Sequence, residues 1–247
     1  MMRAIPDIGG ILCVYLLSPT GGIVQGDRYR IDLHIGDGAR ALFTTQSATK
    51  IYRMPDGCAE QVSRIDVGRG AFFEYVPDAA ILFAEADYHQ RTEVSVGEGA
   101  LVLLYDIIMP GRLARGERFA FRRLVNRTIV SDADGLLLYE SFTLEPANFD
   151  LDMSGRLEGY SCWGSATLLG DFQAWGLDGE ALVSEFAPML GNLNWQEGIG
   201  GVSLLARGGL TARVISHRLE TIYTLFSQIR LCVRALCFGQ PGAPLRK

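Results

Sequence analysis

The stretch RIDLHIGDGARALFTT, Arg30 to Thr45, joins an alternating apolar segment to a nearly continuous one through the turn Gly-Asp-Gly-Ala. Two later stretches repeat this pattern, RIDVGRGAFFEYVPD from Arg64 and EVSVGEGALVLLYDI from Glu93. The turns begin, at intervals of 32 and 29 residues, at Gly36, Gly68 and Gly97. A nearly constant interval of this size is typical of stacked repeats.

Each repeat unit has a clear physical interpretation. Glycine tolerates positive φ, so each Gly-charged-Gly turn can reverse the chain tightly, and we expect plain hairpin turns. A phosphate-binding loop is excluded because no helix follows the turns. An alternating strand has one solvated face, whereas a continuous apolar strand is buried on both faces. One unit cannot bury its own apolar face, so the units are expected to stack.

The predicted fold class is mainly β, with stacked, helically wound sheets that resemble a β-solenoid and one or two C-terminal helices. Asp178 can cap a short helix that ends at Leu190. A longer amphipathic helix is predicted between a capping Ser216 and a terminating Gly239. Its apolar positions follow a spacing of three and four residues, at Leu219, Ile222, Phe226, Ile229, Val233 and Leu236. No linker divides the chain, which is predicted to be a single domain, residues 1–247.

Composition excludes several classes of protein. The net charge of −5 argues against a nucleic-acid-binding protein, which needs a basic face. The five cysteines are scattered without a C-x-x-C pair, so neither a zinc ribbon nor a disulfide framework is indicated. No apolar run approaches the roughly 20 residues that span a bilayer. These features predict a cytoplasmic protein with reduced thiols and no membrane segment.

No motif supports catalysis. The chain has no G-x-S-x-G elbow and no paired histidines. We interpret His34 as a solvent-facing strand residue, His89 as an exposed loop residue, and His217 as a structural residue in the first turn of the late helix.

The acidic residues are more informative, since carboxylates are uncommon in strands and are seldom buried without a partner. Those that lie in apolar or glycine-rich surroundings are Asp27, Glu74, Asp106, Glu117 and Glu140. In one interpretation each forms a salt bridge with an arginine, such as Arg112, Arg115 or Arg118. In the other, the acids line a polar route inside the β-stack.

The run ALFTTQSATKIYR, Ala41 to Arg53, suits the second interpretation, because hydroxyl and amide groups hydrate a channel without holding a cation tightly. The alternative is that threonine is simply a good strand former. The candidate lining residues are Thr44, Thr45, Gln46, Ser47, Thr49, Tyr52 and Arg53.

The chain resembles the urease accessory proteins of the UreD family, also called UreH. The similarity rests on S-P-x-G-G-x-x-x-G-D and T-T-x-x-A-T-K-x-Y-R within residues 16–57, and on GAFFEYVPD, YDIIMPGRLARGERF, DGLLLYESFTL and the closing PLRK. It extends from Ile11 to the C-terminus and is weakest over residues 150–200. Members usually carry more N-terminal sequence, so we expect either a truncated start or a missing cap.

This resemblance implies a non-enzymatic role in inserting nickel into apo-urease. The expected partners are apo-urease, a UreF-like scaffold and, through it, a UreG-like GTPase. It also implies a polar nickel tunnel whose acidic lining corresponds to Asp27, Asp106, Glu117 and Glu140, with transient Ni²⁺ and no tightly bound cofactor. The alternatives are an interaction scaffold without metal transit and a hydrolase with a β-fold.

Overall fold

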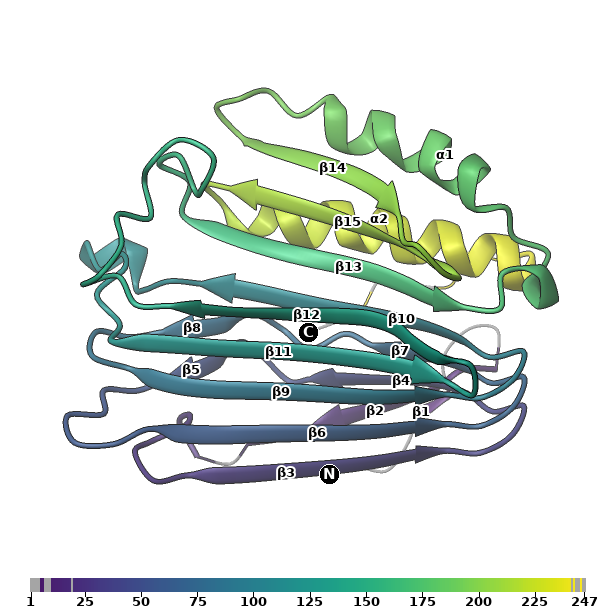
Figure 1. Ribbon diagram of the computed structural model, residues 1–247, viewed down its shortest axis with the longest axis horizontal. Coiled ribbons are helices and arrows are strands. Elements are labelled where there is room, and N and C mark those ends of the chain that lie inside the picture. Colours follow the sequence, from purple (N-terminus) through teal and green to yellow (C-terminus); the bar gives the residue numbers. More distant parts are fainter. Residues whose placement is uncertain (1–4, 7–9, 19, 241, 243–244, 246–247) are drawn as a thin grey trace.

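The computed structural model describes residues 5–6, 10–18, 20–240, 242 and 245. Strands dominate, and two helices lie late in the chain (Figure 1). The first strands are β1 (Ile5–Pro6), β2 (Leu12–Leu16), β3 (Arg28–Ile35), β4 (Arg40–Thr45), β5 (Thr49–Ile51), β6 (Ala59–Val67), β7 (Phe72–Tyr75) and β8 (Ala80–Leu82). The remaining elements are β9 (Asp87–Val96), β10 (Leu101–Met109), β11 (Arg123–Asp132), β12 (Gly135–Leu144), β13 (Cys162–Gly170), α1 (Gly179–Gly191), β14 (Gly198–Leu204), β15 (Gly209–Ser216) and α2 (Leu219–Phe238).

The strands form two stacked sheets. Sheet A has ten strands, in the order β1-β2-β4-β7-β10-β13-β15-β14, with β5 and β8 beside this path. Sheet B has five strands, in the order β12-β11-β9-β6-β3. The chain passes from one sheet to the other and back, so that β3, β6, β9 and β11 lie parallel in sheet B. This is a β-solenoid of about three coils, as the repeat predicts.

The Gly-charged-Gly turns are corners between the sheets, so the expectation of hairpins is wrong. The strands on either side of a turn belong to different sheets, and each pairs with the strand one coil away. Gly38 and Gly70 adopt φ of +64° and +61°, which glycine accommodates without strain. A parallel pair must be joined through a crossover, and here the other sheet provides it.

The first glycine of the second and third turns is required by the stacking itself. A Cβ on Gly68 would lie 2.6 Å from the backbone nitrogen of Asp37, and one on Gly97 would lie 2.8 Å from the carbonyl carbon of Gly68. A Cβ on Gly36, in the first turn, would meet nothing within 4 Å. The turns therefore rest directly on one another along the solenoid.

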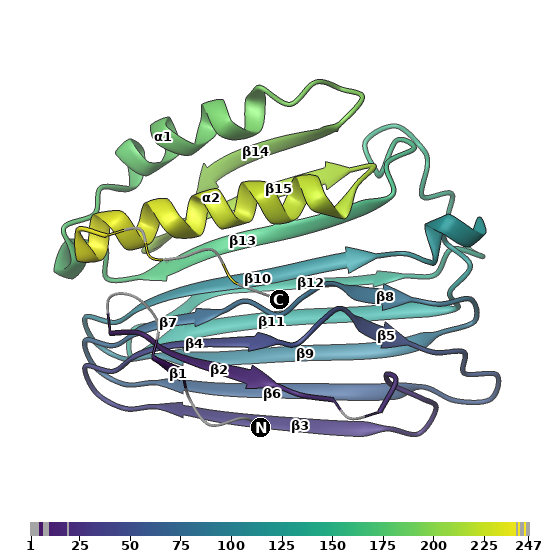
Figure 2. The ribbon, with the colours of Figure 1, turned by 180° about the vertical axis from the view of Figure 1, so that it is seen from behind.

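The helices cover the part of the outer face of sheet A that β13, β14 and β15 form (Figure 2). The Asp178 side chain accepts a hydrogen bond from the backbone N–H of Ala181, which confirms the predicted cap of α1. The long helix α2 ends at Gly239 with φ of +71°, as predicted. It begins at Leu219 without a side-chain cap, because Ser216 lies in β15 and its hydroxyl donates to the carbonyl of Glu197. Within α2, Leu236 is exposed, while Arg230 and Arg234 are buried.

Candidate functional site

Polar side chains form a band across the middle of the space between the two sheets. The inward residues of β9 are, in order, Tyr88, Gln90, Thr92, Val94 and Val96, so two polar residues separate two apolar groups. The same apolar-polar-apolar order occurs on β6 and β11, which neighbour β9 in sheet B, and on β10 of sheet A. The residues that we call the polar band are Gln61, Ser63, Gln90, Thr92, Asp106, Asn126 and Thr128. Two separate apolar clusters flank the band, one near the glycine turns and one at the opposite strand ends.

Asp106 is the carboxylate at the centre of this band. It projects from β10 towards sheet B, where Asn126 donates to its Oδ2 and Gln90 approaches its Oδ1 at 3.5 Å. In the part of the chain that the structure describes, no arginine, lysine or histidine forms an ion pair with it. Burial raises the pKa of Asp106 to about 6, with the nearby Glu140 carboxylate adding to the effect and the two amides opposing it. The carboxylate is therefore ionised at neutral pH and keeps neutral hydrogen-bond partners.

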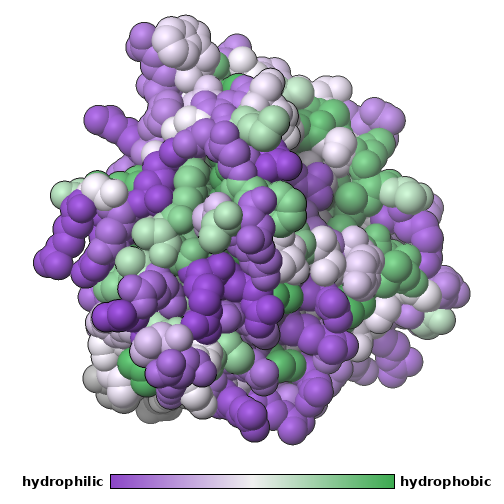
Figure 3. Space-filling view, turned by 60° about the vertical axis from the view of Figure 1, so that its left-hand side comes forward, coloured by the Kyte–Doolittle hydropathy of each residue, from purple (hydrophilic) through white to green (hydrophobic). Residues whose placement is uncertain are grey.

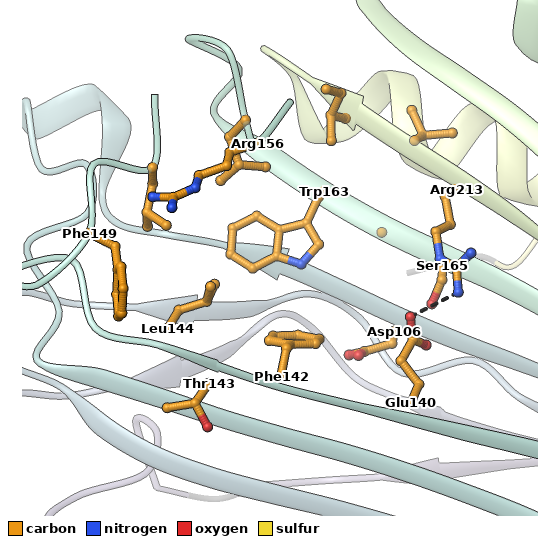
Figure 4. A pocket seen from close by; sticks show the side chains of 15 residues that line it. Asp106, Glu140, Phe142, Thr143, Leu144, Phe149, Arg156, Trp163, Ser165 and Arg213 are labelled. Atoms are coloured by element: carbon orange, nitrogen blue, oxygen red, sulfur yellow. Dashed lines mark hydrogen bonds and ion pairs between the residues drawn. The ribbon is translucent and has the colours of Figure 1, made fainter. Parts of the chain in front are cut away.

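A cavity of about 490 Å³, which we call the mouth, opens where sheet A extends past the last strand of sheet B. Asp106, Glu140, Ser165 and Arg213 lie together at one end, and Phe142, Leu144, Phe149 and Trp163 form apolar walls (Figure 4). Arg213 donates to Glu140 at 3.0 Å. Figure 3, in which the left-hand side of Figure 1 comes forward, shows apolar residues gathered in the upper half of that face among hydrophilic ones.

Sheet A is interrupted at the level of the polar band. Strands β4 and β5 are separated by residues 46–48, and β7 and β8 are separated by residues 76–79. Beside this gap β10 continues unbroken and pairs with β7 and then with β8. The Thr45 hydroxyl accepts from the backbone N–H of Asp78 at 2.8 Å across the gap. We call this gap the window.

Cavities lie on both sides of the window. On the helix side, a cavity of about 770 Å³ is lined by Gln46, Ser47, Pro77 and Asp78 and by residues of α2 that include Tyr223 and Arg230. Between the sheets, a cavity of about 40 Å³ is lined by Thr45, Thr49, Pro77, Asp78 and Asp106 among others. Pro77 and Asp78 form part of the wall of both cavities.

A further small cavity completes a row from the window to the mouth. It has a volume of about 20 Å³, and Asp106, Glu140 and Ser165 line both this cavity and the mouth. Tyr75, Gln90 and Asp106 line both small cavities. Because burial raises the pKa of Tyr75, its phenol is neutral at physiological pH. Asp106 is the residue shared by the mouth and both small cavities.

The residues predicted from sequence fall into two groups. Asp106, Glu140, Thr45 and Thr49 line the row of cavities between the sheets, and Gln46 and Ser47 line the cavity outside the window. The other predicted residues have different contacts. Thr44 is fully buried, and its hydroxyl donates to the carbonyl of Val76 at 2.7 Å.

The remaining candidates form contacts away from the polar band. The Asp27 carboxylate accepts the backbone N–H of Val24 at 2.9 Å in the turn before β3. Glu117 is bound by Arg112 through two hydrogen bonds, and this partner holds the pKa of Glu117 below its usual range. Tyr52 donates to the carbonyl of Gly21, and Arg53 pairs with Glu85 on the surface.

Some of the candidate carboxylates form salt bridges with arginine and others do not. Glu117 pairs with Arg112, as the salt-bridge interpretation predicts, and Glu140 pairs with Arg213, an arginine that this interpretation did not include. Glu74 pairs with Arg234 of α2, which was not among the arginines considered from sequence. Asp106 has neutral partners. The structure also adds residues that the sequence interpretation missed: Tyr75, Asp78, Gln90 and Asn126. Counting back in steps of two from the apolar Val96 would have placed Gln90 on the inner face.

The histidines also differ from expectation. His34 is exposed on β3, as predicted, and lies 3.0 Å from Asp66. The loop assignment of His89 is wrong, because this residue lies within β9 and is 3.0 Å from the buried carboxylate of Asp87. His217 precedes α2 and packs against the Tyr160 ring.

Within the described residues, no helix is both long and apolar enough to span a membrane.

Comparison with known proteins gives consistent matches. The whole chain, residues 1–247, matches the family described as UreD urease accessory protein. A urease accessory protein UreD from Cenarchaeum symbiosum is 34% identical over 248 residues, covering 98% of this chain and 84% of the relative. A urease accessory protein UreD 2 from Streptomyces griseus subsp. griseus is 35% identical, covering 98% and 82%. One from Corynebacterium glutamicum is 34% identical, covering 98% and 85%. These relatives are named as accessory proteins and not as enzymes.

Proposed function

The chain belongs to the UreD urease accessory protein family and thus has a role in urease maturation, and we propose that it conducts Ni²⁺ between the window and the mouth. The observation that carries this proposal is the position of Asp106. Its carboxylate lies on the wall of three successive cavities and has only neutral partners among the described residues. It is therefore free to attract a passing cation.

The donor atoms suit transit better than storage. Nickel(II) binds tightly to imidazole and thiolate, and a free ion would occupy unintended sites. The cavity row offers oxygen ligands instead, from Asp106, Glu140 and the hydroxyls of Thr45, Thr92 and Ser165. Arg213 neutralises Glu140, which leaves about one net negative charge at the centre of the row. A site of this kind attracts a divalent cation without retaining it.

The narrow part of the row sets a size limit. A cavity needs roughly 10–15 Å³ of space open to the centre of a water molecule to hold one water. Cavities of about 20 and 40 Å³ therefore hold one to a few waters. A nickel ion crossing here must exchange most of its hydration shell for protein oxygens. Asp106 compensates for part of that loss of hydration, since its carboxylate supplies one or two oxygen ligands together with a negative charge.

The two openings lie on different sides of the protein and can therefore serve different partners. The window opens beside α2, on the outer face of sheet A, and the mouth opens at the edge of sheet B. We infer that one opening faces the UreF-like scaffold, which recruits the UreG-like GTPase, and that the other faces apo-urease. In this proposal the protein is a cytoplasmic nickel-insertion chaperone without catalysis or a tightly bound cofactor.

The test replaces Asp106 with asparagine, which preserves shape and hydrogen bonding and removes the charge. We expect Asp106→Asn to lower urease activation in cells at least tenfold, while pull-downs recover the partners in wild-type amounts. Glu117→Gln is the matched control, because Glu117 is held by Arg112 away from the cavities. Normal activation by Asp106→Asn would remove the conduit and favour a scaffold through which no metal passes.

A further inference from the structure

Three potential metal ligands from two neighbouring coils meet on the outer face of sheet B. Cys58 immediately precedes β6, Glu60 lies in β6, and His89 lies opposite Glu60 in β9. One ligand atom from each of these three residues lies within 4.8 Å of the other two. In the part of the chain that the structure describes, this is the one such group that includes both a thiol and an imidazole.

The position follows from the repeat. Glu60 lies eight residues before Gly68, and His89 lies eight residues before Gly97. Residues at the same distance from stacked turns become neighbours in parallel strands, as the pairing of Glu60 with His89 shows. Arg28 occupies the equivalent position in the first coil and lies on the other side of Glu60. The sequence thus carried a signal for this cluster that is visible only once the turns are superposed.

The separation of the ligand atoms is compatible with a bound ion. Metal–ligand bonds of about 2.0–2.3 Å place two ligands of one ion no more than about 4.6 Å apart. Ligand atoms already within 4.8 Å need only small side-chain rotations to reach this spacing. Glu60 is exposed and free to adjust, while Cys58 and His89 are half-buried and more constrained.

His89 also has the partner that metal-binding histidines usually have. Its Nε2 lies 3.0 Å from Oδ1 of Asp87, whose side chain is 7% exposed. Arg122 and Arg123 hold that carboxylate in place. Arg123 Nη2 lies 3.0 Å from the same Nε2, so two tautomers are possible in the free protein. Metal binding selects the tautomer in which Nε2–H donates to Asp87; Arg123 then gives up its contact with Nε2 and donates to Asp87 alone, and the Nδ1 lone pair is left for the ion.

We propose that Cys58, Glu60 and His89 form a site for a late first-row divalent cation of the Ni²⁺ and Zn²⁺ type. One thiolate, one imidazole and one carboxylate form a mixed set that favours these ions over Mg²⁺ and Ca²⁺. The site is separate from the cavity row. Gln61 and Gln90, the residues next to Glu60 and His89, point to the opposite face and line a cavity with Asp106. The proposal does not depend on passage of nickel between the sheets.

Cobalt(II) alone is the probe, because a thiolate bound to Co²⁺ gives an intense charge-transfer absorption that oxygen and nitrogen ligands do not give. We expect the full chain to bind one equivalent with this absorption, and Zn²⁺ or Ni²⁺ to displace it. Cys58→Ser should abolish the band and weaken binding at least tenfold. His89→Gln should weaken binding at least tenfold while the thiolate remains available.

The controls separate this site from other thiols and from the conduit. Cys232→Ser removes a partly buried thiol on α2 and should leave the band unchanged. Asp106→Asn should also leave it unchanged, whatever its effect on urease activation. A band that persists in Cys58→Ser, or the absence of a thiolate band in the wild-type protein, would overturn the proposal.

Discussion

Asn126 on β11 donates a hydrogen bond to the carboxylate of Asp106 on β10 across the space between the two sheets. This contact gives an anion in the middle of a β-sandwich a neutral partner. Elsewhere in the same protein the buried Glu74 is paired with arginine. The two carboxylates therefore should respond in opposite ways when their charge is removed.

Asp106→Asn should alter the pH dependence of stability. Burial raises the pKa of Asp106 in the folded state to about 6, above the unfolded value near 4. The stability that the protonated carboxyl contributes is fully present below pH 4 and is lost as pH rises through 6. Above pH 6 the wild-type protein bears a penalty of about 3 kcal/mol at most, which the asparagine variant lacks. Urea unfolding at pH 5 and 7.5 measures this. A stability difference between variant and wild type that is the same at both pH values would contradict it.

Glu74→Gln should strongly destabilise the protein. Glu74 and its partner Arg234 are at most 1% exposed, and Arg234 reaches both carboxylate oxygens, at 2.8 and 2.5 Å. Removing one charge of such a pair costs about 3–5 kcal/mol, because the arginine remains buried. Glu140→Gln is the matched control: its partner Arg213 is 55% exposed, so a loss below about 1 kcal/mol is expected. Chemical denaturation measures both, and equal losses would refute the distinction.

Alanine should be tolerated at one glycine turn and not at the next. In Gly68→Ala the new Cβ would lie 2.6 Å from the backbone of the adjacent turn, so the coils must separate locally. We expect a loss of about 1–3 kcal/mol. The new Cβ in Gly36→Ala would meet nothing within 4 Å, so the free energy of unfolding should change by no more than about 1 kcal/mol and can increase. Thermal unfolding of the two variants, side by side, measures the difference; similar transition temperatures would argue against direct contact between turns.

Ser47→Trp tests the window. Ser47 lies in the break between β4 and β5 and lines the cavity on the helix side. A tryptophan there should fill the approach to Asp78 and lower urease activation at least tenfold, with stability within about 1 kcal/mol of wild type, as expected for an exposed position. Ser95→Trp places the same side chain on the exposed outer face of sheet B and should leave activation unchanged. If both variants activate urease normally, nickel does not pass through this opening.

The sequence alone determined the coil architecture and much of the inner face. The Gly-charged-Gly repeat predicts stacked coils because a unit with an unburied apolar face must pack on its neighbours. The hydroxyl-rich run and the carboxylate in apolar surroundings pointed to Thr45, Thr49 and Asp106, and period-two alternation accounts for the inward direction that the structure gives them. The family could also be recognised from local motifs, since these consist of consecutive residues.

Only the tertiary structure decided which charges are paired and where the sheet opens. Glu74 and Arg234 are 160 residues apart, and no local pattern joins them. Glu117 pairs with an arginine five residues away in the chain, which local sequence could suggest, whereas the partners of Asp106 are Gln90 and Asn126 from two other strands. The window depends on two strand breaks that coincide one coil apart. Local sequence sets the direction of a side chain, whereas its partners, and hence its charge and its role, depend on segments that folding alone brings together.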